Sequence, residues 1–370
     1  MTSRDSSRRL RAPLALWTLA AVGRWLLGCT AEAHGEEAPA SLREFPGARG
    51  ASEQPAAPSP SAAIPAAPAV PTILLSAVGD CTLGDPAGAE RAPGSFHKTF
   101  EDGDYTRPFS GVAPILGKDD LTIANLEGTL TTEGCRRDVP FAFRGKPEFA
   151  KMLALGSVDV VSMANNHSAD CGPRGVTQTR ESLTQEKIGF FGLGVVDTRT
   201  VNGIEVKNLG YTGGRLEVRE QVKKDVAAQK KSDNLVIVSF HWGIEGEHAA
   251  TDVQQKLGRA AIDAGADLVL GHHPHVLQGM EEYKGKKIVY SLGNFVFGGN
   301  AQPGERTSMI YQARFELRGG SVTPVNDGVV PVFVSGNRVQ NDFRPVLIDG
   351  PEKEAALAEI ASYDKLVPSR

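Results

Sequence analysis

The sequence predicts an α/β protein, a sandwich of mixed β-sheets, and three observations support this fold class. The chain has 370 residues, of which 41% are hydrophobic, which is enough to bury a globular core. Short apolar stretches alternate along the chain with stretches that have the apolar spacing of helices. Stretches such as 235–240 and 268–270 are apolar on both faces, as expected for strands that are covered on both sides.

The expected elements form one domain without an internal repeat. Strands are expected within 72–80, 120–128, 158–167, 234–243, 267–275 and 286–297, and helices within 147–156, 175–187 and 253–265. Longer strands with alternating apolar residues follow around 309–317 and 329–334. A last helix is expected over about 351–363.

The region before this domain has the composition of a targeting segment and a tether. Residues 1–29 combine arginines with a short apolar run, 14–23, which is typical of a signal peptide. The run ends in "WLLGC", which resembles a lipobox with Cys29 as the lipidated residue. Ordinary secretion and an uncleaved anchor are the alternatives. Residues 30–71 are rich in Ala and Pro and are expected to be a disordered tether, so the folded domain spans 72–370 and lies outside the cytoplasm at a membrane.

The net charge argues against a nucleic-acid partner. The formal charge is −4 at pH 7, and no dense run of Lys or Arg occurs beyond the N-terminus. Proteins that bind nucleic acid carry a basic patch that neutralises phosphates. We therefore expect no nucleic-acid partner.

Polar residues follow five of the expected strands at the point where each strand ends. They are Asp80, Glu127, the run Asn165–His167, His241, and the pair His273 and His275. Ligands of open α/β sheets bind at the carboxyl ends of strands, where several loops converge. Carboxylate, amide and imidazole groups together suit Mn, Zn, Fe or similar divalent ions better than Ca or Mg. The sequence therefore predicts a site for one or two such ions.

Each of these residues has a structural alternative when it is taken alone. Asp80 and Glu127 could be helix N-caps, and Asn165–Asn166 is a common turn sequence. The segment His273-Pro274-His275 is expected to be extended, which places both histidines on one face. His272 would then point the opposite way and serve a structural role.

Six motifs in order resemble those of the CapA family of capsule and poly-γ-glutamate synthesis proteins, a branch of the calcineurin-like metallophosphatases. The motifs are "SAVGDCTLG", "IANLEGTL", "VVSMANNHSADCG", "VSFHWGIE", "GHHPHVLQ" and "IVYSLGNFVFG". They span residues 73 to about 297. The resemblance implies a two-layer mixed β-sandwich flanked by helices, with a dinuclear metal site at the sheet edge.

The resemblance also implies a role for each strand-end residue. Asp80 and His275 would bind the first ion and Glu127 would bridge, while Asn166, His241 and His273 would hold the second. His167 would not bind metal but would steady the transition state or protonate the leaving group. Asp170 would orient the imidazole of His167.

One position departs from the metallophosphatase pattern. The residue two after Asp80 is usually a histidine, and here it is Thr82. The first ion therefore has Asp80, Glu127 and His275, with water or the Cys81 thiolate as a further ligand. Cys135 and Cys171 form either a disulfide beside the site or two packed thiols.

These features lead to a functional hypothesis with two alternatives. The resemblance implies a metal-dependent hydrolase-type protein that acts on an anionic polymer, poly-γ-glutamate or capsule, and that is held at a membrane by its N-terminus. The first alternative is a non-catalytic accessory subunit beside polymer synthase or export subunits. The second is a general envelope phosphoesterase.

Overall fold

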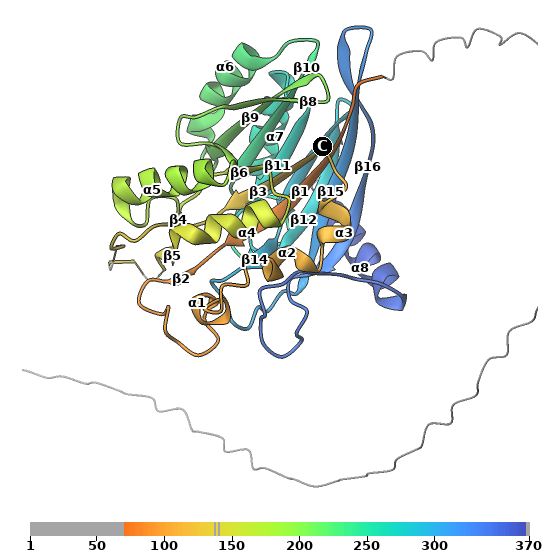
Figure 1. Ribbon diagram of the computed structural model, residues 1–370. Coiled ribbons are helices and arrows are strands. Elements are labelled where there is room, and N and C mark those ends of the chain that lie inside the picture. Colours follow the sequence, from red (N-terminus) through yellow and green to blue (C-terminus); the bar gives the residue numbers. More distant parts are fainter. Residues whose placement is uncertain (1–69, 137, 140, 368–370) are drawn as a thin grey trace, which may run out of the picture. The chain divides into compact units, whose positions relative to one another are not determined.

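Two β-sheets packed face to face form the centre of the protein (Figure 1). The computed structural model describes residues 70–136, 138–139 and 141–367. The compact unit Ala66–Arg370 contains all of them. The expected signal peptide, Cys29 and all but the last two residues of the expected tether lie outside the described residues.

The first sheet has eight strands, seven of them in the order β17-β16-β15-β1-β3-β6-β7, with β14 also paired to β1. Strands β1, β3, β6 and β7 run parallel, whereas β15 is antiparallel to β1. The strands are β1 (Thr72–Thr82), β3 (Leu121–Leu126), β6 (Val160–Ser162), β7 (Gly189–Phe191), β14 (Asn294–Phe297), β15 (Thr307–Arg318), β16 (Ser321–Phe333) and β17 (Val346–Leu347).

The second sheet has six strands in the order β12-β13-β11-β10-β9-β8. Its four central strands are parallel and its two edge strands are antiparallel. The strands are β8 (Asp197–Val201), β9 (Ile204–Thr212), β10 (Asn234–His241), β11 (Leu268–His272), β12 (Leu277–Tyr283) and β13 (Lys286–Leu292). A small third sheet joins β2 (Asp85–Pro86), β5 (Phe143–Gly145) and β4 (Thr129–Leu130).

Helices cover the outer face of each sheet, so the apolar core has three layers. The longer helices are α4 (Ala150–Leu155), α5 (Gly172–Gln185), α6 (Arg219–Gln229), α7 (Asp252–Asp263) and α8 (Pro351–Ser362). Short helices are α1 (Phe96–Thr99), α2 (Arg107–Ser110), α3 (Ala113–Leu116), η1 (Pro147–Phe149), η2 (Leu216–Val218) and η3 (Tyr363–Leu366).

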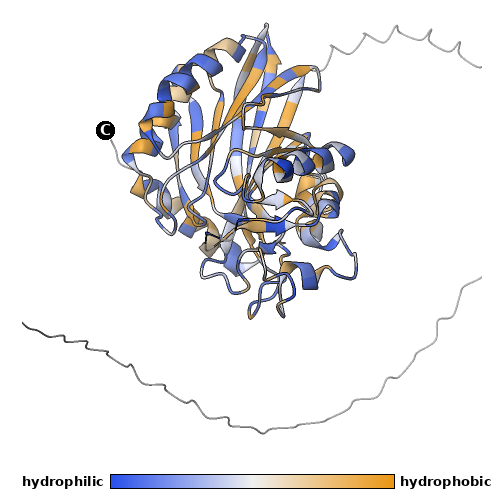
Figure 2. Cartoon of the chain, turned by 90° about the vertical axis from the view of Figure 1, so that its left-hand side faces the viewer, coloured by the Kyte–Doolittle hydropathy of each residue, from blue (hydrophilic) through white to orange (hydrophobic). Residues whose placement is uncertain are grey.

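Helices α1 to α5 pack on the first sheet, and α6 and α7 pack on the second. Between the sheets lies a cluster that includes Leu75, Ile123 and Ile237. Apolar residues accordingly lie along the strands, while the helices are hydrophilic on their outer faces (Figure 2). The predicted fold, a two-layer mixed β-sandwich flanked by helices, is confirmed.

An irregularity in β1 determines which way Asp80 points. Ala77 pairs with Ile123, but Asp80 pairs with Asn125, so β1 has one more residue than β3 between these pairs. The extra residue reverses the alternation of side chains that a regular strand would have. Asp80 therefore lies on the same side of the sheet as Ala77, between the two sheets, whereas Cys81 packs into the outer cluster.

Gly79 makes this arrangement possible because it lies against the backbone of Gly293. A Cβ atom at position 79 would overlap the carbonyl group of Gly293. The neighbouring Asp80 N donates a hydrogen bond to Gly293 O over 2.9 Å. Any larger residue at position 79 would push β1 away from this segment and displace Asp80.

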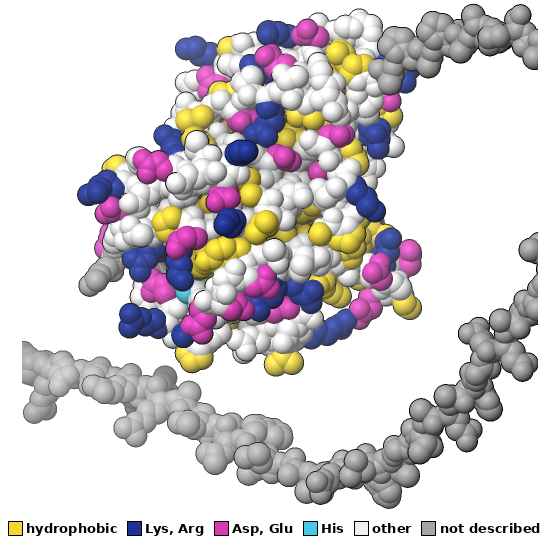
Figure 3. Space-filling view, in the orientation of Figure 1, with side chains coloured by type: hydrophobic (Ala, Val, Ile, Leu, Met, Phe, Trp, Pro, Cys, Tyr) yellow, Lys and Arg dark blue, Asp and Glu magenta, His cyan; other side chains and the backbone are white. Residues whose placement is uncertain are grey.

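The surface carries both signs of charge. On the face shown in Figure 3, Lys and Arg side chains are interspersed with Asp and Glu side chains. Within the described residues, no helix is both long enough and apolar enough to span a bilayer.

Asp119, which precedes β3, gives a prediction for stability against pH. Burial raises its pKa to about 6, because the effect of burial and of the nearby Asp159 and Asp120 outweighs hydrogen bonds from Ser76 and Thr122. The folded state therefore binds the proton more tightly than the unfolded chain, so this residue costs stability as pH rises through about 4 to 6.

Replacing Asp119 by Asn should remove that cost. We expect Asp119→Asn to raise the free energy of unfolding by about 1 kcal/mol at pH 7.5, allowing for the half-exposed position, and to have little effect at pH 4.5. Urea unfolding of both proteins at the two pH values measures this. An equal change at both values would contradict it.

Candidate metal centre

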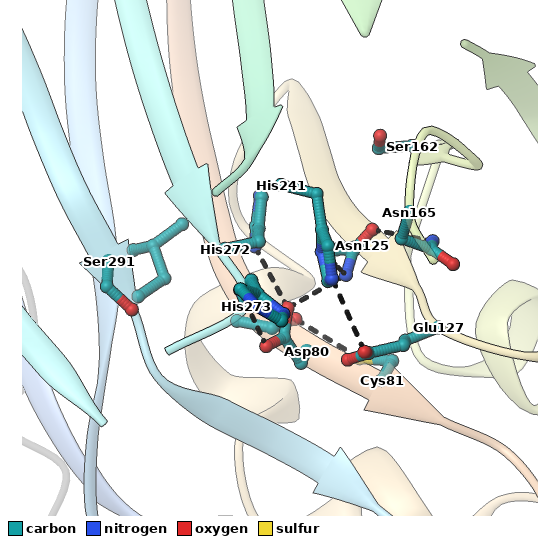
Figure 4. Close-up of polar contacts among 12 residues, drawn as sticks. Asp80, Cys81, Asn125, Glu127, Ser162, Asn165, His241, His272, His273 and Ser291 are labelled. Atoms are coloured by element: carbon teal, nitrogen blue, oxygen red, sulfur yellow. Dashed lines mark hydrogen bonds and ion pairs between the residues drawn. The ribbon is translucent and has the colours of Figure 1, made fainter. Parts of the chain in front are cut away.

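Side chains from both sheets converge at one end of the sandwich (Figure 4). Asp80 comes from β1 and Glu127 follows β3, both in the first sheet. His241 ends β10 and His272 ends β11, both in the second sheet. In β10 and β11, Ile237 and Leu270 face the first sheet, and the period of two places His241 and His272 on that same side. Parallel strands of the two sheets thus deliver these groups to one place.

The carboxylate of Asp80 is fully buried and has many partners. Its Oδ1 accepts a hydrogen bond from Asn125 Nδ2 over 2.8 Å, and its Oδ2 accepts one from His273 N over 3.2 Å. His275 Nδ1 lies 3.2 Å from Oδ2, and His272 Nδ1 lies 3.3 Å from Oδ1. Burial acts to raise the pKa of Asp80, but the hydrogen bonds and charges of His272 and His275 hold it well below its usual value. Asp80 is thus fixed in place as an anion.

Glu127 differs from Asp80 because neither of its carboxylate oxygens has a hydrogen-bond partner among residues 70–136, 138–139 and 141–367, although the side chain is 0% exposed. Its Oε1 lies 3.5 Å from His241 Nε2, 3.8 Å from His275 Nε2 and 3.9 Å from His167 Nε2. Burial and the charge of Asp80 raise its pKa well above the usual value. A buried carboxylate without partners is costly, and a cation between it and the imidazoles would satisfy it.

The His273–His275 segment is a turn, not the extended segment that the sequence predicted. His273 has φ 99° and His275 has φ 59°, a conformation that non-glycine residues rarely adopt. Such strain is found at functional sites, where the surrounding structure holds it in place. His275 Nδ1 lies 2.9 Å from Asn294 Oδ1, while His273 Nδ1 is buried and has no partner within the described residues.

The prediction that His272 points away from the site is wrong. Its ring lies beside Asp80, with Nδ1 3.3 Å from Asp80 Oδ1, and is 1% exposed. The reason is the turn that starts at His273, because alternation along an extended segment does not apply across it. Asn125 was also missed, although it shares the inner face of β3 with Ile123 and could have been found from that alternation.

The two asparagines after β6 have different roles. Asn165 is buried, donates to Leu126 O over 2.9 Å and accepts from His167 N over 3.1 Å, so it stabilises the turn. Asn166 is exposed, and its Oδ1 lies 2.7 Å from His241 Nε2. The predicted ligand Asn166 is therefore at the centre, beside His241.

His167 and Asp170 form a hydrogen-bonded pair at the edge of the centre. His167 Nδ1 lies 2.7 Å from Asp170 Oδ2, which also accepts from Phe143 N over 2.8 Å. The ring of Phe143 packs edge-on against the imidazole with 4.6 Å between centroids. Asp170 and Phe143 together fix the ring so that Nε2 faces Glu127.

Thr82 brings no imidazole to the ligand set, and Cys81 points away from it. Thr82 is fully buried and its Oγ1 has no hydrogen-bond partner among the described residues. The Cys81 thiol packs in the outer apolar cluster and donates to Gly79 O, and burial raises its pKa to about 12. The possibility of a Cys81 thiolate ligand is not supported, because the irregularity in β1 turns this side chain to the other face.

Cys135 and Cys171 are joined by a disulfide. Cys171 directly follows Asp170, and Arg136 N donates to Asp170 O over 2.9 Å. The bond therefore fastens the loop before β5 to the segment that carries Asp170. Of the two alternatives that the sequence left open, the structure has the disulfide.

Three groups of side chains in the described residues could each hold a cation. Each group offers three ligand atoms that lie within 4.8 Å of one another. The groups are Glu127 with His241 and His273, Asp80 with Glu127 and His275, and Glu245 with His273 and His275. The mixture of carboxylate and imidazole suits a borderline divalent ion. The Glu127 carboxylate and His273 Nδ1, which have no hydrogen bond among the described residues, fit such an ion.

The fold and the site define a class of protein: a two-sheet α/β sandwich with a buried carboxylate and imidazole centre at the ends of its parallel strands. Comparison with known families agrees with the motifs. The chain belongs to the family described as "Bacterial capsule synthesis protein PGA_cap", whose family model matches residues 74–299. The resemblance to capsule and poly-γ-glutamate synthesis proteins is thereby confirmed.

Curated relatives include two Bacillus proteins. The "Capsule biosynthesis protein CapA" of Bacillus anthracis is 32% identical over 218 residues, covering 51% of this chain and 53% of that protein. The "PGA biosynthesis protein CapA" of Bacillus subtilis is 32% identical over 213 residues, covering 51% and 56%. The chain thus spans about half the length of these relatives.

Two further similarities are more distant. A "Probable polyglutamine synthesis accessory protein" of Mycobacterium tuberculosis is 27% identical over 277 residues, covering 64% of this chain and 72% of that protein. A solved structure of a phosphatase from Mycoplasma pneumoniae is 15% identical with a TM-score of 0.41, covering 72% of this chain and 95% of that one. A structural similarity of this strength carries no inference about chemistry.

Proposed function

We propose that this protein is a metal-dependent hydrolase-type protein that acts on an anionic cell-envelope polymer, poly-γ-glutamate or capsule. Glu127 carries the proposal, because its fully buried carboxylate faces three imidazoles and has no hydrogen bond in the described part of the chain. The names of the two Bacillus relatives, which refer to capsule and PGA biosynthesis, support the polymer. One or two Mn, Zn, Fe or similar ions would bind Asp80, Glu127, Asn166, His241, His273 and His275.

The residues around the centre have separate tasks in such a reaction. Bound divalent ions polarise the scissile group and offset the negative charge that develops on it. They would also reduce the repulsion between an acidic protein and a polyanion. His167 donates its Nδ1 proton to Asp170, which leaves Nε2 directed at the centre. A protonated His167 can therefore give its Nε2 proton to the leaving group as a general acid.

The location is also a proposal. The signal-like residues 1–29, with Cys29 as lipidation site, and the tether 30–71 would place the domain outside the cytoplasm and anchor it to a membrane. The disulfide Cys135–Cys171 is typical of an oxidising compartment and agrees with that location. Polymer synthase or export subunits would then be its neighbours.

A second candidate is the accessory subunit, and two observations favour it. Position 82 is a threonine where a histidine would complete the first ion's site, and the Mycobacterium relative is named as an accessory protein. In this case the domain would bind the polymer without cleaving it. A general phosphoesterase is a third candidate, which the Mycoplasma similarity is too weak to support.

One assay separates the three candidates. The purified, metal-loaded protein is incubated with poly-γ-glutamate, with capsule polymer and with p-nitrophenyl phosphate, and each reaction is repeated after chelation of the metal. We expect the polymer to shorten only when metal is present, with slow turnover of the small phosphoester. Polymer binding without cleavage would favour the accessory subunit. Rapid turnover of p-nitrophenyl phosphate with an intact polymer would favour the phosphoesterase.

A further inference from the structure

Glu245 lies in the loop between β10 and α7, at the solvent-facing edge of the centre. Its side chain is exposed and has no hydrogen bond or ion pair with any described residue. The loop is fastened to the histidine turn on both sides of it, because Trp242 N donates to His272 O over 3.0 Å and Gly246 N donates to Pro274 O over 2.8 Å. Glu245 is therefore held beside His273 and His275 although it is exposed.

Glu245 shares both of its imidazole neighbours with the buried groups. It forms a candidate cation group with His273 and His275. His273 also belongs to the group of Glu127 and His241, and His275 to the group of Asp80 and Glu127. A neutral imidazole has one free lone pair, so each histidine binds one cation at a time. The outer position and the two inner positions therefore compete for the same ligands.

The two inner carboxylates are out of reach of solvent, whereas Glu245 is not. Asp80 and Glu127 are each 0% exposed. A hydrated cation must exchange its water for protein ligands before it reaches them. Glu245 offers the first negative charge at the surface, and the two histidines that it shares belong to both the outer and the inner groups.

We propose that Glu245, with His273 and His275, forms an outer cation position through which divalent ions reach and leave the buried centre. The proposal rests on the metal centre of the proposed function. Glu245 then acts as a loading ligand, a residue that holds the ion during transfer and not in the final complex. Such a residue changes the rates of uptake and release by the same factor and leaves the equilibrium affinity unaltered.

The test uses the full chain stripped of metal, with Co²⁺ as the probe because its visible absorption reports coordination. Stopped-flow mixing gives the uptake rate, excess EDTA gives the release rate, and competition with a chelator gives Kd. For Glu245→Gln we expect the uptake rate and the release rate of Co²⁺ each to fall about tenfold, because a charge that steers the ion to the site is lost. We expect Kd to change less than twofold. Glu247→Gln is the matched control, because Glu247 is an exposed carboxylate of the same loop that belongs to no candidate group.

Each other result overturns the proposal. Rates for Glu245→Gln equal to those of the parent would show that the residue has no part in loading. Weaker Co²⁺ binding by Glu245→Gln with an unchanged uptake rate would show that Glu245 is a permanent ligand. If Glu247→Gln slowed uptake and release as much as Glu245→Gln, the effect would come from the overall charge of the loop. Polymer cleavage by the parent protein is measured separately, so failure of the hydrolase proposal is distinguishable from failure of this one.

Discussion

Glu127→Gln should lower the affinity for Mn²⁺ or Zn²⁺ by at least about a hundredfold, because even residues that only support metal ligands contribute about 10- to 100-fold. Glutamine has nearly the same shape, so the packing around position 127 is retained while the negative charge is lost. The Glu127 carboxylate has no hydrogen bond to any residue that the structure describes, so the variant loses none. We therefore expect the metal-free variant to unfold at no lower temperature than the parent.

Asp267→Asn is a matched control for that experiment. Asp267 is also buried, but it belongs to no candidate cation group. It pairs with Lys230 at 2.5 Å and with Lys286 at 2.7 Å, and it accepts a hydrogen bond from Val236 N over 2.9 Å. Loss of its charge leaves two lysines without their partner, so we expect lower stability and unchanged metal affinity. Isothermal titration and thermal melting of both variants measure the contrast. Unchanged affinity in Glu127→Gln would contradict the metal centre.

His167→Ala should reduce kcat for polymer cleavage by about 10²- to 10⁴-fold, the usual contribution of a general acid. The affinity for metal should stay within about threefold, because His167 belongs to none of the candidate cation groups. Asp170→Asn should lower kcat by a smaller factor, because the ring would lose its orienting partner but keep Nε2.

His97 provides a control for the loss of an imidazole that is paired with an aspartate. Its Nδ1 lies 2.7 Å from Asp85 Oδ2, the same distance as in the His167–Asp170 pair, and it belongs to no candidate cation group. His97→Gln should leave kcat within about threefold of the parent. Steady-state rates at saturating metal, together with titration of metal into each variant, measure these effects. Equal rates for His167→Ala and the parent would exclude His167 as the general acid.

The positions of Asp80, Glu127, Asn166, His241 and His275 could be expected from the sequence, because each follows an apolar run that is recognisable as a strand. The carboxyl ends of parallel strands meet at one edge, so chain order alone brings such residues together. The fold class was predictable for the same reason, since alternating strands and helices restrict the layers that can form.

Other residues of the centre could not be predicted, because they depend on the local backbone. The direction of Cys81 is set by the irregular pairing of β1 with β3, which no periodicity of the sequence records. His272 was misplaced because the positive φ of His273 ends the alternation. Glu245 lies in a loop, where spacing along the chain says nothing about spatial neighbours. The backbone hydrogen bonds from Trp242 to His272 and from Gly246 to Pro274 bring it to the histidines.

Both inner cation groups take ligands from the two sheets: Glu127 and Asp80 belong to one, and His241, His273 and His275 to the other. Neither half of the sandwich has all the ligands of an inner group, so the two buried positions cannot be filled until the halves have docked during folding. Once captured, it would oppose their separation, adding about 2.7 kcal/mol to the unfolding free energy at a hundredfold excess over Kd. Metal supply would thus govern how long this domain stays folded, apart from any part in chemistry.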